Sequence, residues 1–146
     1  MVTLRKITKD NYGTCFDLKV AEGKKDYVAS NVYSLAQAWV YCDTAYPFAI
    51  YAGEEMVGFV MMGYMKDEEK YTIWRFMIGE RFQAKGYGKA ALQLSINYLK
   101  DKHGANEIYL SFVPGNDTAE KLYENAGFKR TGEIDDGEIV MRMDLK

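Results

Sequence analysis

A short segment with two glycines, residues 83–88, most constrains what this chain can fold into, because it joins an apolar run to a helical pattern. The run covers residues 73–78, and the pattern begins near Lys89. Glycine adopts backbone angles that a Cβ closes to other residues. Gly86 and Gly88 therefore allow consecutive amide N–H groups to converge on one anion at the positive end of a helix. A strand, a phosphate-binding loop and a helix in this order predict a domain that binds a negatively charged cofactor.

Two other phosphate-binding patterns fit this segment less well. A Walker loop needs glycine, four residues and then Gly-Lys-Ser/Thr, but alanine follows Gly88-Lys89 and glutamine replaces the first glycine. The stretch 86–91 fits the G-x-G-x-x-A form of a dinucleotide fingerprint, yet residues 79–85 separate it from the strand. In addition, the carboxylate that binds the ribose should lie at the end of the next apolar run, whereas Glu107 lies at its start. A nicotinamide cofactor stays the weaker alternative.

With its surroundings, the glycine segment resembles motif A of the GNAT superfamily of acetyl-CoA-dependent N-acetyltransferases, whose loop reads Gln/Arg-x-x-Gly-x-Gly/Ala. Residues 76–82 resemble the strand and connection that precede this loop. Residues 108–116 and 119–128, with an asparagine, a Leu-Tyr pair and a Gly-Phe pair, resemble motif B. Two motifs in the family's order are more specific than either alone. With the ending at residues 131–135, the resemblance covers about the last half of the chain.

The resemblance implies an α/β (α+β) GNAT fold. Its centre is a mixed, mostly antiparallel sheet of about seven strands, splayed between the fourth and fifth strands, with about four helices. The residue pattern predicts strands at 2–7, 48–51, 56–64, 71–78, 108–113, 128–134 and 138–143, and helices after 8–10, near 34–42, at 89–103 and at 117–126. A break at Pro114-Gly115 fits the splay, the gap in which the family's pantetheine arm lies. Ser34 with Gln37 is expected to form a capping box for the second helix.

The resemblance also implies acetyl-CoA as the co-substrate. Tyr123 resembles the motif B tyrosine to which the family assigns the general-acid role; packing is the alternative, since Tyr123 shares an apolar helical stripe with Leu122 and Ala126. Asn116 is expected to touch CoA, or to serve as a turn residue. Ala84 replaces the family's usual glycine, so the loop should keep a conformation that tolerates a methyl group. The other predicted CoA-binding residues are Phe76, Met77, Ile78, Gln83, Lys85, Gly86, Tyr87, Gly88 and Lys89.

Acetyl transfer to an amine needs help at three points. An alkyl amine has a reference pKa near ~10.4, so exposing its lone pair at pH 7 costs roughly 4 to 5 kcal/mol. The backbone N–H of the fourth strand is expected to stabilise the oxyanion, and Tyr123 to protonate the CoA thiolate. Many relatives carry an acidic residue on the fourth strand as part of the base, but here residues 73–75 read Ile-Trp-Arg. Candidate bases are therefore Glu22, Asp26 and the acidic stretch 67–69.

The N-terminal half varies most within the superfamily, so it carries the information on the acceptor. Segments between residues 18 and 38, with the closing 132–135, resemble the bacterial spermine/spermidine acetyltransferase branch. We therefore expect a polyamine as acceptor, with Glu22, Asp26 and Trp74 among the residues that bind it. Two alternatives stay open: a different acceptor, either an amino sugar or antibiotic or a protein amine, and a CoA-binding module without turnover.

Length and composition agree with a small enzyme. With 146 residues the chain is predicted to form one N-acetyltransferase domain, residues 1–146. A net charge of −2 and a pI near 5.5 predict neither nucleic acid nor membrane as partner and suit a cationic substrate better. The resemblance implies a small-molecule amine as partner; relatives commonly dimerise, so a homodimer is compatible. The lack of a long apolar run or signal peptide predicts a cytoplasmic protein. Cys15, Cys42 and the single His103 form no metal-binding pattern, and both cysteines are expected to be buried in helices.

Overall fold

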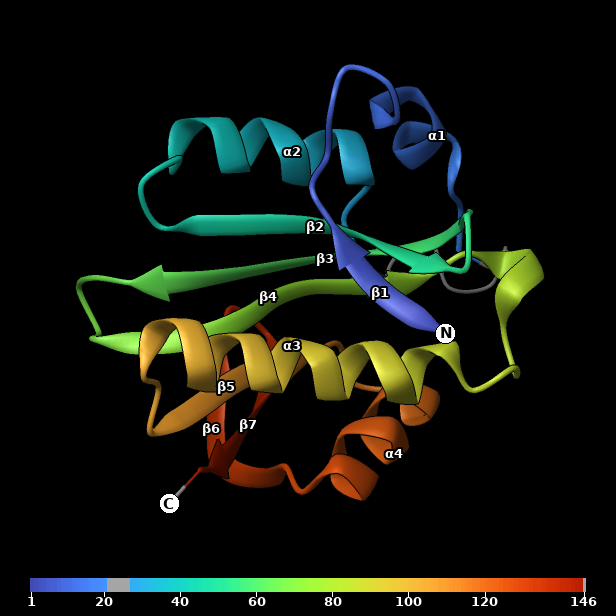
Figure 1. Ribbon diagram of the computed structural model, residues 1–146. Coiled ribbons are helices and arrows are strands. Elements are labelled where there is room, and N and C mark those ends of the chain that lie inside the picture. The colour runs from blue at the N-terminus through green and yellow to red at the C-terminus, as the bar shows by residue number, and fades with distance from the viewer. Residues whose placement is uncertain (21–26, 146) are drawn as a thin grey trace.

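The computed structural model describes residues 1–20 and 27–145 of the chain. In chain order the elements are β1 (Val2–Arg5), α1 (Tyr12–Asp17), α2 (Asn31–Val40), β2 (Ala45–Ala52), β3 (Glu55–Met65), β4 (Lys70–Ile78), the 3-10 helix η2 (Glu80–Phe82), α3 (Tyr87–His103), β5 (Glu107–Phe112), α4 (Asp117–Ala126), β6 (Lys129–Asp135) and β7 (Glu138–Asp144). The strands form one seven-stranded sheet with the order β1-β2-β3-β4-β5-β7-β6 (Figure 1). Over the described ranges, the prediction of a mixed sheet of seven strands with four α-helices is confirmed.

The sheet opens between β4 and β5. Every other neighbouring pair of strands is antiparallel, whereas β4 and β5 are parallel and share a single register pair, Thr72 with Tyr109. β4 runs on to Ile78 and β5 to Phe112 without further pairing between them in the part of the chain that the structure describes. The predicted splay is therefore confirmed, and it exposes the facing edges of both strands.

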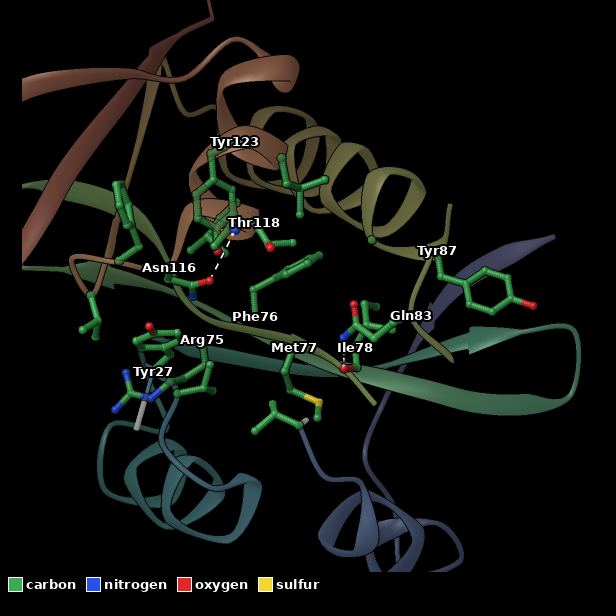
Figure 2. A pocket seen from close by; sticks show the side chains of 18 of the residues that line it. Tyr27, Arg75, Phe76, Met77, Ile78, Gln83, Tyr87, Asn116, Thr118 and Tyr123 are labelled. Carbon is green, nitrogen blue, oxygen red and sulfur yellow. Dashed lines mark hydrogen bonds between the residues drawn. The ribbon is translucent and has the colours of Figure 1, made fainter. Parts of the chain in front are cut away.

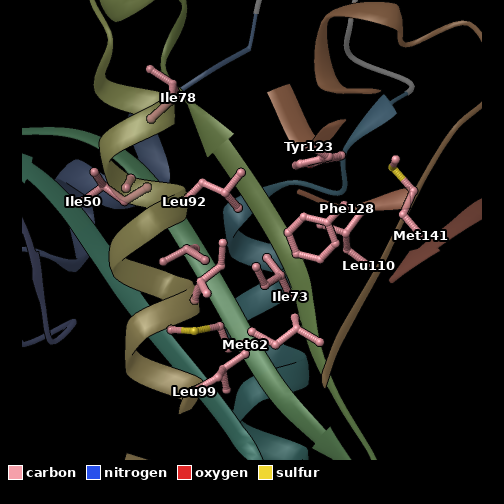
Figure 3. Close-up of a cluster of buried hydrophobic side chains, with 14 of the residues drawn as sticks. Ile50, Met62, Ile73, Ile78, Leu92, Leu99, Leu110, Tyr123, Phe128 and Met141 are labelled. Atoms are coloured by element: carbon pink, nitrogen blue, oxygen red, sulfur yellow. The ribbon is translucent and has the colours of Figure 1, made fainter. Parts of the chain in front are cut away.

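Helices cover both faces of the sheet: α1 and α2 lie on one side, and α3 and α4 on the other (Figure 1). β3 is buried from Met56 to Gly63, as expected of a central strand covered on both faces. The larger core lies between the sheet and α3, where Leu92 and Leu99 meet Met62 and Ile73 (Figure 3). Burial of such side chains stabilises the fold by roughly 1.5–3 kcal/mol each, and it fixes the helix whose first turn borders the sheet opening.

The second helix differs from its prediction. α2 begins at Asn31, and its N-cap is Ser30, whose Oγ accepts a hydrogen bond from the N–H of Tyr33 over 3.1 Å. Ser34 lies one turn inside the helix, is buried and donates to the carbonyl of Ser30, so the capping box expected at Ser34 is wrong. The reason is that Ser30 caps as well as Ser34 does, and the added first turn buries Asn31, whose Nδ2 donates to the carbonyl of Cys15 over 2.9 Å.

The two cysteines have different environments. Cys15 in α1 is fully buried, as expected. α2 ends at Val40, so Cys42 falls in the turn that follows and is exposed; its predicted burial within a helix is wrong. Residues 41–44 form the turn between the end of α2 and Ala45, where β2 begins its pairing with β3.

Candidate active site

A cavity of about 760 Å³ lies where β4 and β5 part (Figure 2). Its walls come from β4, the segments before α2 and before α3, the start of α4 and the adjoining ends of β5 and β7. The volume is typical of small-molecule and cofactor sites. The predicted site residues that line the cavity are Trp74, Phe76, Met77, Ile78, Gln83, Ala84, Gly86, Tyr87, Gly88, Lys89, Asn116 and Tyr123. Lys85 is exposed on the same loop but does not line the cavity, and Glu22 and Asp26 lie outside the described residues.

The first turn of α3 forms an anion cradle beside this cavity. Gly86 is the N-cap, with a left-handed φ of 84°, and no side chain caps the helix. Its carbonyl accepts the first intrahelical hydrogen bond from Ala90 over 3.2 Å, so the N–H groups of Tyr87, Gly88 and Lys89 have no partner within the helix. These donors, at the positive end of a 17-residue helix, fit a phosphate group.

The loop before α3 keeps the backbone shape of a glycine-rich loop even where glycine is absent. Ala84 has a φ of 60°, in the left-handed region, so the loop accepts the backbone strain that the methyl group of alanine causes there. That conformation costs an alanine about 1–2 kcal/mol. The Gln83 side chain donates from Nε2 to the carbonyl of Ile78 over 2.7 Å, which ties the loop to the end of β4 (Figure 2). The side-chain amide of Gln83 therefore holds the loop in place.

The edge of β4 supplies backbone donors to the cavity. The N–H of Gly79 donates to the carbonyl of Val57 on β3 over 2.8 Å. Because amide groups alternate sides along a strand, the N–H groups of Phe76 and Ile78 point away from β3 and toward the opening. The bond from Gln83 to the Ile78 carbonyl is consistent with this direction. Two amide donors thus face the space between β4 and β5, as an oxyanion site requires.

Tyr123 is both a core residue and a cavity residue. Only 7% of it is exposed, and its ring packs between Phe112 and Phe128, with centroid distances of 6.5 and 6.2 Å. Burial raises the pKa of Tyr123 to about 12, and the charge of Glu138 adds to the effect. The hydroxyl is therefore neutral at physiological pH and can donate a hydrogen bond into the cavity.

Asn116 has a structural role as the N-cap of α4. Its Oδ1 accepts from the N–H of Ala119 over 3.4 Å, while the residue also lines the cavity (Figure 2). The cap fixes the start of the helix that carries Tyr123. The helix ends at Gly127, which has a left-handed φ of 112°. The predicted use as a turn residue and the predicted contact with CoA are therefore compatible, because the cap leaves the side-chain Nδ2 group free to donate.

Arg75 lies on β4, near the position where many relatives have an acidic residue. Arg75 donates to Oε1 of Gln37 over 2.8 Å and to the carbonyl of Trp74 over 3.1 Å. Its Nε atom is buried and has no hydrogen-bond partner among the described residues. Burial lowers the pKa of the Arg75 guanidinium, and the charge of Glu138 opposes this. β4 therefore offers a donor at this point and no carboxylate.

A model of the acetyltransferase (GNAT) family matches residues 9–128 of the chain. The chain is also 34% identical, over 99% of both sequences, to the spermine/spermidine N(1)-acetyltransferase of Bacillus subtilis strain 168. The chain belongs to the GNAT acetyltransferase family. This GNAT N-acetyltransferase shares its fold with the PaiA N-acetyltransferase of Thermoplasma acidophilum, solved with coenzyme A, at a TM-score of 0.77 and 18% identity over 99% of both chains. The spermidine N-acetyltransferase of Vibrio cholerae, solved with CoA and spermine, gives a TM-score of 0.76 and 18% identity over 97% of this chain and 92% of that chain.

Sequence reasoning missed one acidic residue that lines the acetyltransferase's cavity, and it named as a candidate base an acidic stretch that lies outside the cavity. Glu138 at the start of β7 lines the cavity and accepts a hydrogen bond from Oγ of Ser111 over 2.9 Å. The acidic stretch 67–69, proposed as a source of the base, lies in the exposed turn between β3 and β4 and does not line the cavity. The one local signal for Glu138 is the Asp136-Gly137 turn, which fixes where β7 begins.

Two further observations concern metals and membranes. Within residues 1–20 and 27–145, no group of three or more His, Cys, Asp and Glu side chains is placed to hold a metal ion. Over the same ranges, no helix is both long enough and apolar enough to span a bilayer.

Proposed function

We propose that this acetyltransferase transfers the acetyl group of acetyl-CoA to a primary amine of a polyamine such as spermidine or spermine, by direct attack in a ternary complex. The observation that carries the proposal is the cavity itself, which joins the free amides of α3 to the hydroxyl of Tyr123. The proposal includes a single acetyltransferase domain over residues 1–146, in the cytoplasm. It is compatible with a homodimer.

The residues present fit the charged and extended parts of acetyl-CoA, which supplies its acetyl group as a thioester. The N–H groups at the start of α3 that have no partner within the helix, with Lys85 and Lys89, provide donors and positive charge for the diphosphate. Phe76, Met77 and Ile78 form an open strand edge along which an amide-containing arm can pair as a strand does. The Nδ2 group of Asn116 offers a further donor at the other wall.

The same walls carry the groups that acetyl transfer needs. The N–H groups of Phe76 and Ile78 stabilise the negative charge that develops on the carbonyl oxygen. Tyr123 donates a hydrogen bond from its neutral hydroxyl toward the departing sulfur, since its raised pKa of about 12 keeps the proton on the oxygen. Tyr123 faces the cavity from α4, across from the β4 edge (Figure 2). An acceptor nitrogen between these two walls meets both groups at once.

The choice of a polyamine rests on the relatives and on the residues expected to bind the acceptor. The Bacillus relative described above is a spermine/spermidine acetyltransferase, and it matches this chain along its whole length. Trp74 offers an aromatic face to a cationic acceptor. We keep Glu22 and Asp26 in the proposal as further acceptor-binding residues, on sequence grounds alone.

One observation favours a second candidate acceptor. The unpaired, buried Nε of Arg75 calls for a hydrogen-bond acceptor, which an amine with a neighbouring carbonyl provides and a polyamine does not. A peptide N-terminus has that arrangement. The alternative function is therefore acetylation of a protein amine at the same site, with the same residues toward CoA.

The test is an acetyl-CoA turnover assay that follows thiol release with a panel of amines: spermidine, spermine, an aminoglycoside, short peptides with free N-termini and an N-blocked lysine peptide. The proposal expects release with spermidine or spermine at least tenfold faster, as kcat/KM, than with any other acceptor. Faster release with peptides supports the protein-amine alternative and rejects the polyamine. Calorimetric binding of CoA with no release from any acceptor indicates a CoA-binding module without turnover.

A further inference from the structure

The cavity contains an acidic side chain to which neither GNAT motif assigns a role. Among the described residues that line the cavity, Glu138 carries the one carboxylate. Glu138 is the first residue of β7 and is half-buried. β7 pairs with β5 on one side and with β6 on the other. Glu138 itself pairs with Asp135 of β6, and its neighbour Ile139 pairs with Phe112 of β5, so pairing of the sheet places Glu138 next to the end of β5.

The carboxylate of Glu138 is held at one oxygen and open at the other. Ser111 on β5 donates from Oγ to Oε1 over 2.9 Å. Within residues 1–20 and 27–145, Oε2 has neither a hydrogen bond nor an ion pair. Arg75 forms no ion pair with this carboxylate within the described ranges; its two terminal nitrogens donate to Oε1 of Gln37 and to the Trp74 carbonyl. One carboxylate oxygen is thus left for a ligand in the cavity.

The charge of Glu138 reaches the groups assigned to the reaction. After burial, it is the second cause of the raised pKa of Tyr123. It also partly opposes the lowering of the pKa of Arg75 by burial. Glu138 therefore acts on both the proposed thiolate partner and the β4 position where many relatives have an acidic residue. A negative charge between these groups is suited to a cationic amine.

We propose that Glu138 binds the ammonium group of the acceptor and accepts the proton that its nitrogen loses before attack. The inference rests on the proposed function and names the base which that function lacks. One N–H proton passes to Oε2 of Glu138 and then to solvent. The nitrogen lone pair forms the new C–N bond, the C–S bond breaks with its electron pair on sulfur while the Tyr123 hydroxyl donates a hydrogen bond to it, and a second nitrogen proton passes to the sulfur. The products are an amide, a thiol and one proton.

The test compares Glu138→Gln with the matched control Glu133→Gln, whose carboxylate is exposed on β6 and outside the cavity. Glutamine keeps the oxygen that accepts from Ser111 but removes the charge, so the fold is retained. With spermidine, we expect Glu138→Gln to lower kcat/KM at least 100-fold and to raise the KM for spermidine, while the calorimetric Kd for CoA changes less than twofold. Glu133→Gln should match the wild type. A kcat/KM for Glu138→Gln within threefold of the wild type overturns the inference.

Two more variants separate the charge of Glu138 from its packing. Glu138→Asp keeps the charge on a shorter side chain, so it should recover at least tenfold of the activity that Glu138→Gln loses. Ser111→Ala removes the hydrogen bond that orients the carboxylate and should lower kcat/KM by an intermediate factor, about fivefold to tenfold, without changing CoA binding. Equal activities for Glu138→Asp and Glu138→Gln contradict a role for the charge.

Failure of the proposed function looks different from failure of this inference. If the wild type releases no thiol with any amine, the proposed function fails, and amine binding to the CoA complex still tests Glu138 by calorimetry. We then expect spermidine to bind the wild type at least tenfold more tightly than Glu138→Gln. Equal binding by the two proteins, or no binding by either, overturns the inference.

Discussion

Replacing Tyr123 with phenylalanine tests the assignment of its hydroxyl as the donor to the leaving sulfur. With a pKa of about 12, the hydroxyl is a far weaker acid than an ordinary thiol of pKa ~8.5, so complete proton transfer to the thiolate is uphill by roughly 5 kcal/mol. In the proposed mechanism, Tyr123 therefore acts mainly through a hydrogen bond that strengthens as the C–S bond breaks. A hydrogen bond to a charged group is worth about 1.5–3 kcal/mol, so we expect Tyr123→Phe to lower kcat by roughly 10- to 150-fold.

The KM values for acetyl-CoA and for the amine should change little, because this hydrogen bond forms chiefly in the transition state. The phenylalanine ring keeps its contacts with Phe112 and Phe128, so the free energy of unfolding should change by less than about 1 kcal/mol. Tyr12→Phe, at an exposed position on α1, is the control. A kcat for Tyr123→Phe within twofold of the wild type refutes the reasoning and leaves Tyr123 as a packing residue.

The same pKa makes a prediction about stability. The ordinary tyrosine value near 10 applies to the unfolded chain. Because the folded value is higher, the unfolded chain loses the Tyr123 proton first as pH rises. The stability that this group contributes is present below pH 10 and is lost between about pH 10 and 12. Denaturant unfolding should therefore show a smaller alkaline loss of stability for Tyr123→Phe than for the wild type; equal losses contradict the raised pKa.

Two further predictions concern the loop before α3 and the cysteines. Gly86→Ala should lower the free energy of unfolding of the ligand-free protein by about 1–2 kcal/mol. Ala84→Gly should relieve a similar backbone strain, but it adds about 0.5–1 kcal/mol of conformational entropy to the unfolded chain, so the free energy of unfolding should be unchanged or slightly raised. Equal decreases in the free energy of unfolding of the two variants, measured in urea, would contradict the left-handed assignments. A thiol reagent at pH 8 should label Cys42 rapidly and Cys15 only after denaturation, because burial raises the pKa of Cys15 to about 11 and removes it from solvent. Rapid labelling of both in the native protein is the contrary result.

The features that sequence reasoning found are those encoded in contiguous residues. The glycine segment and the helix after it appear where they were expected, with Gly86 in the left-handed conformation that the motif requires. α4 spans Asp117–Ala126, as its apolar stripe predicts. Where local signals competed, the result differed: both Ser30 and Ser34 are good caps, and tertiary packing of α2 selects Ser30. Local propensity cannot decide between two equivalent caps, because the difference lies in what the rest of the helix buries.

The composition of the active-site cavity depends on contacts between distant segments. Glu138 reads in the sequence as an ordinary strand residue, and it enters the site because β7 inserts between β5 and β6 and brings it to Ser111, 27 residues away. Arg75 likewise depends on a distant segment, because its hydrogen-bond partner Gln37 lies on α2, 38 residues away. No periodicity or motif reports such pairs, since each residue fits its own element equally well with or without them.

By itself, the sequence determined the order of strands and helices, the glycine loop before α3, the family and the position of the tyrosine that resembles motif B, because each depends on the spacing of neighbouring residues along the chain. Only the tertiary structure decided that Thr72 and Tyr109 form the single register pair between β4 and β5, that Ala84 bears left-handed strain and that a carboxylate from β7 lines the cavity. The physical reason is that strand order and register bring together side chains whose separation along the chain carries no local signal.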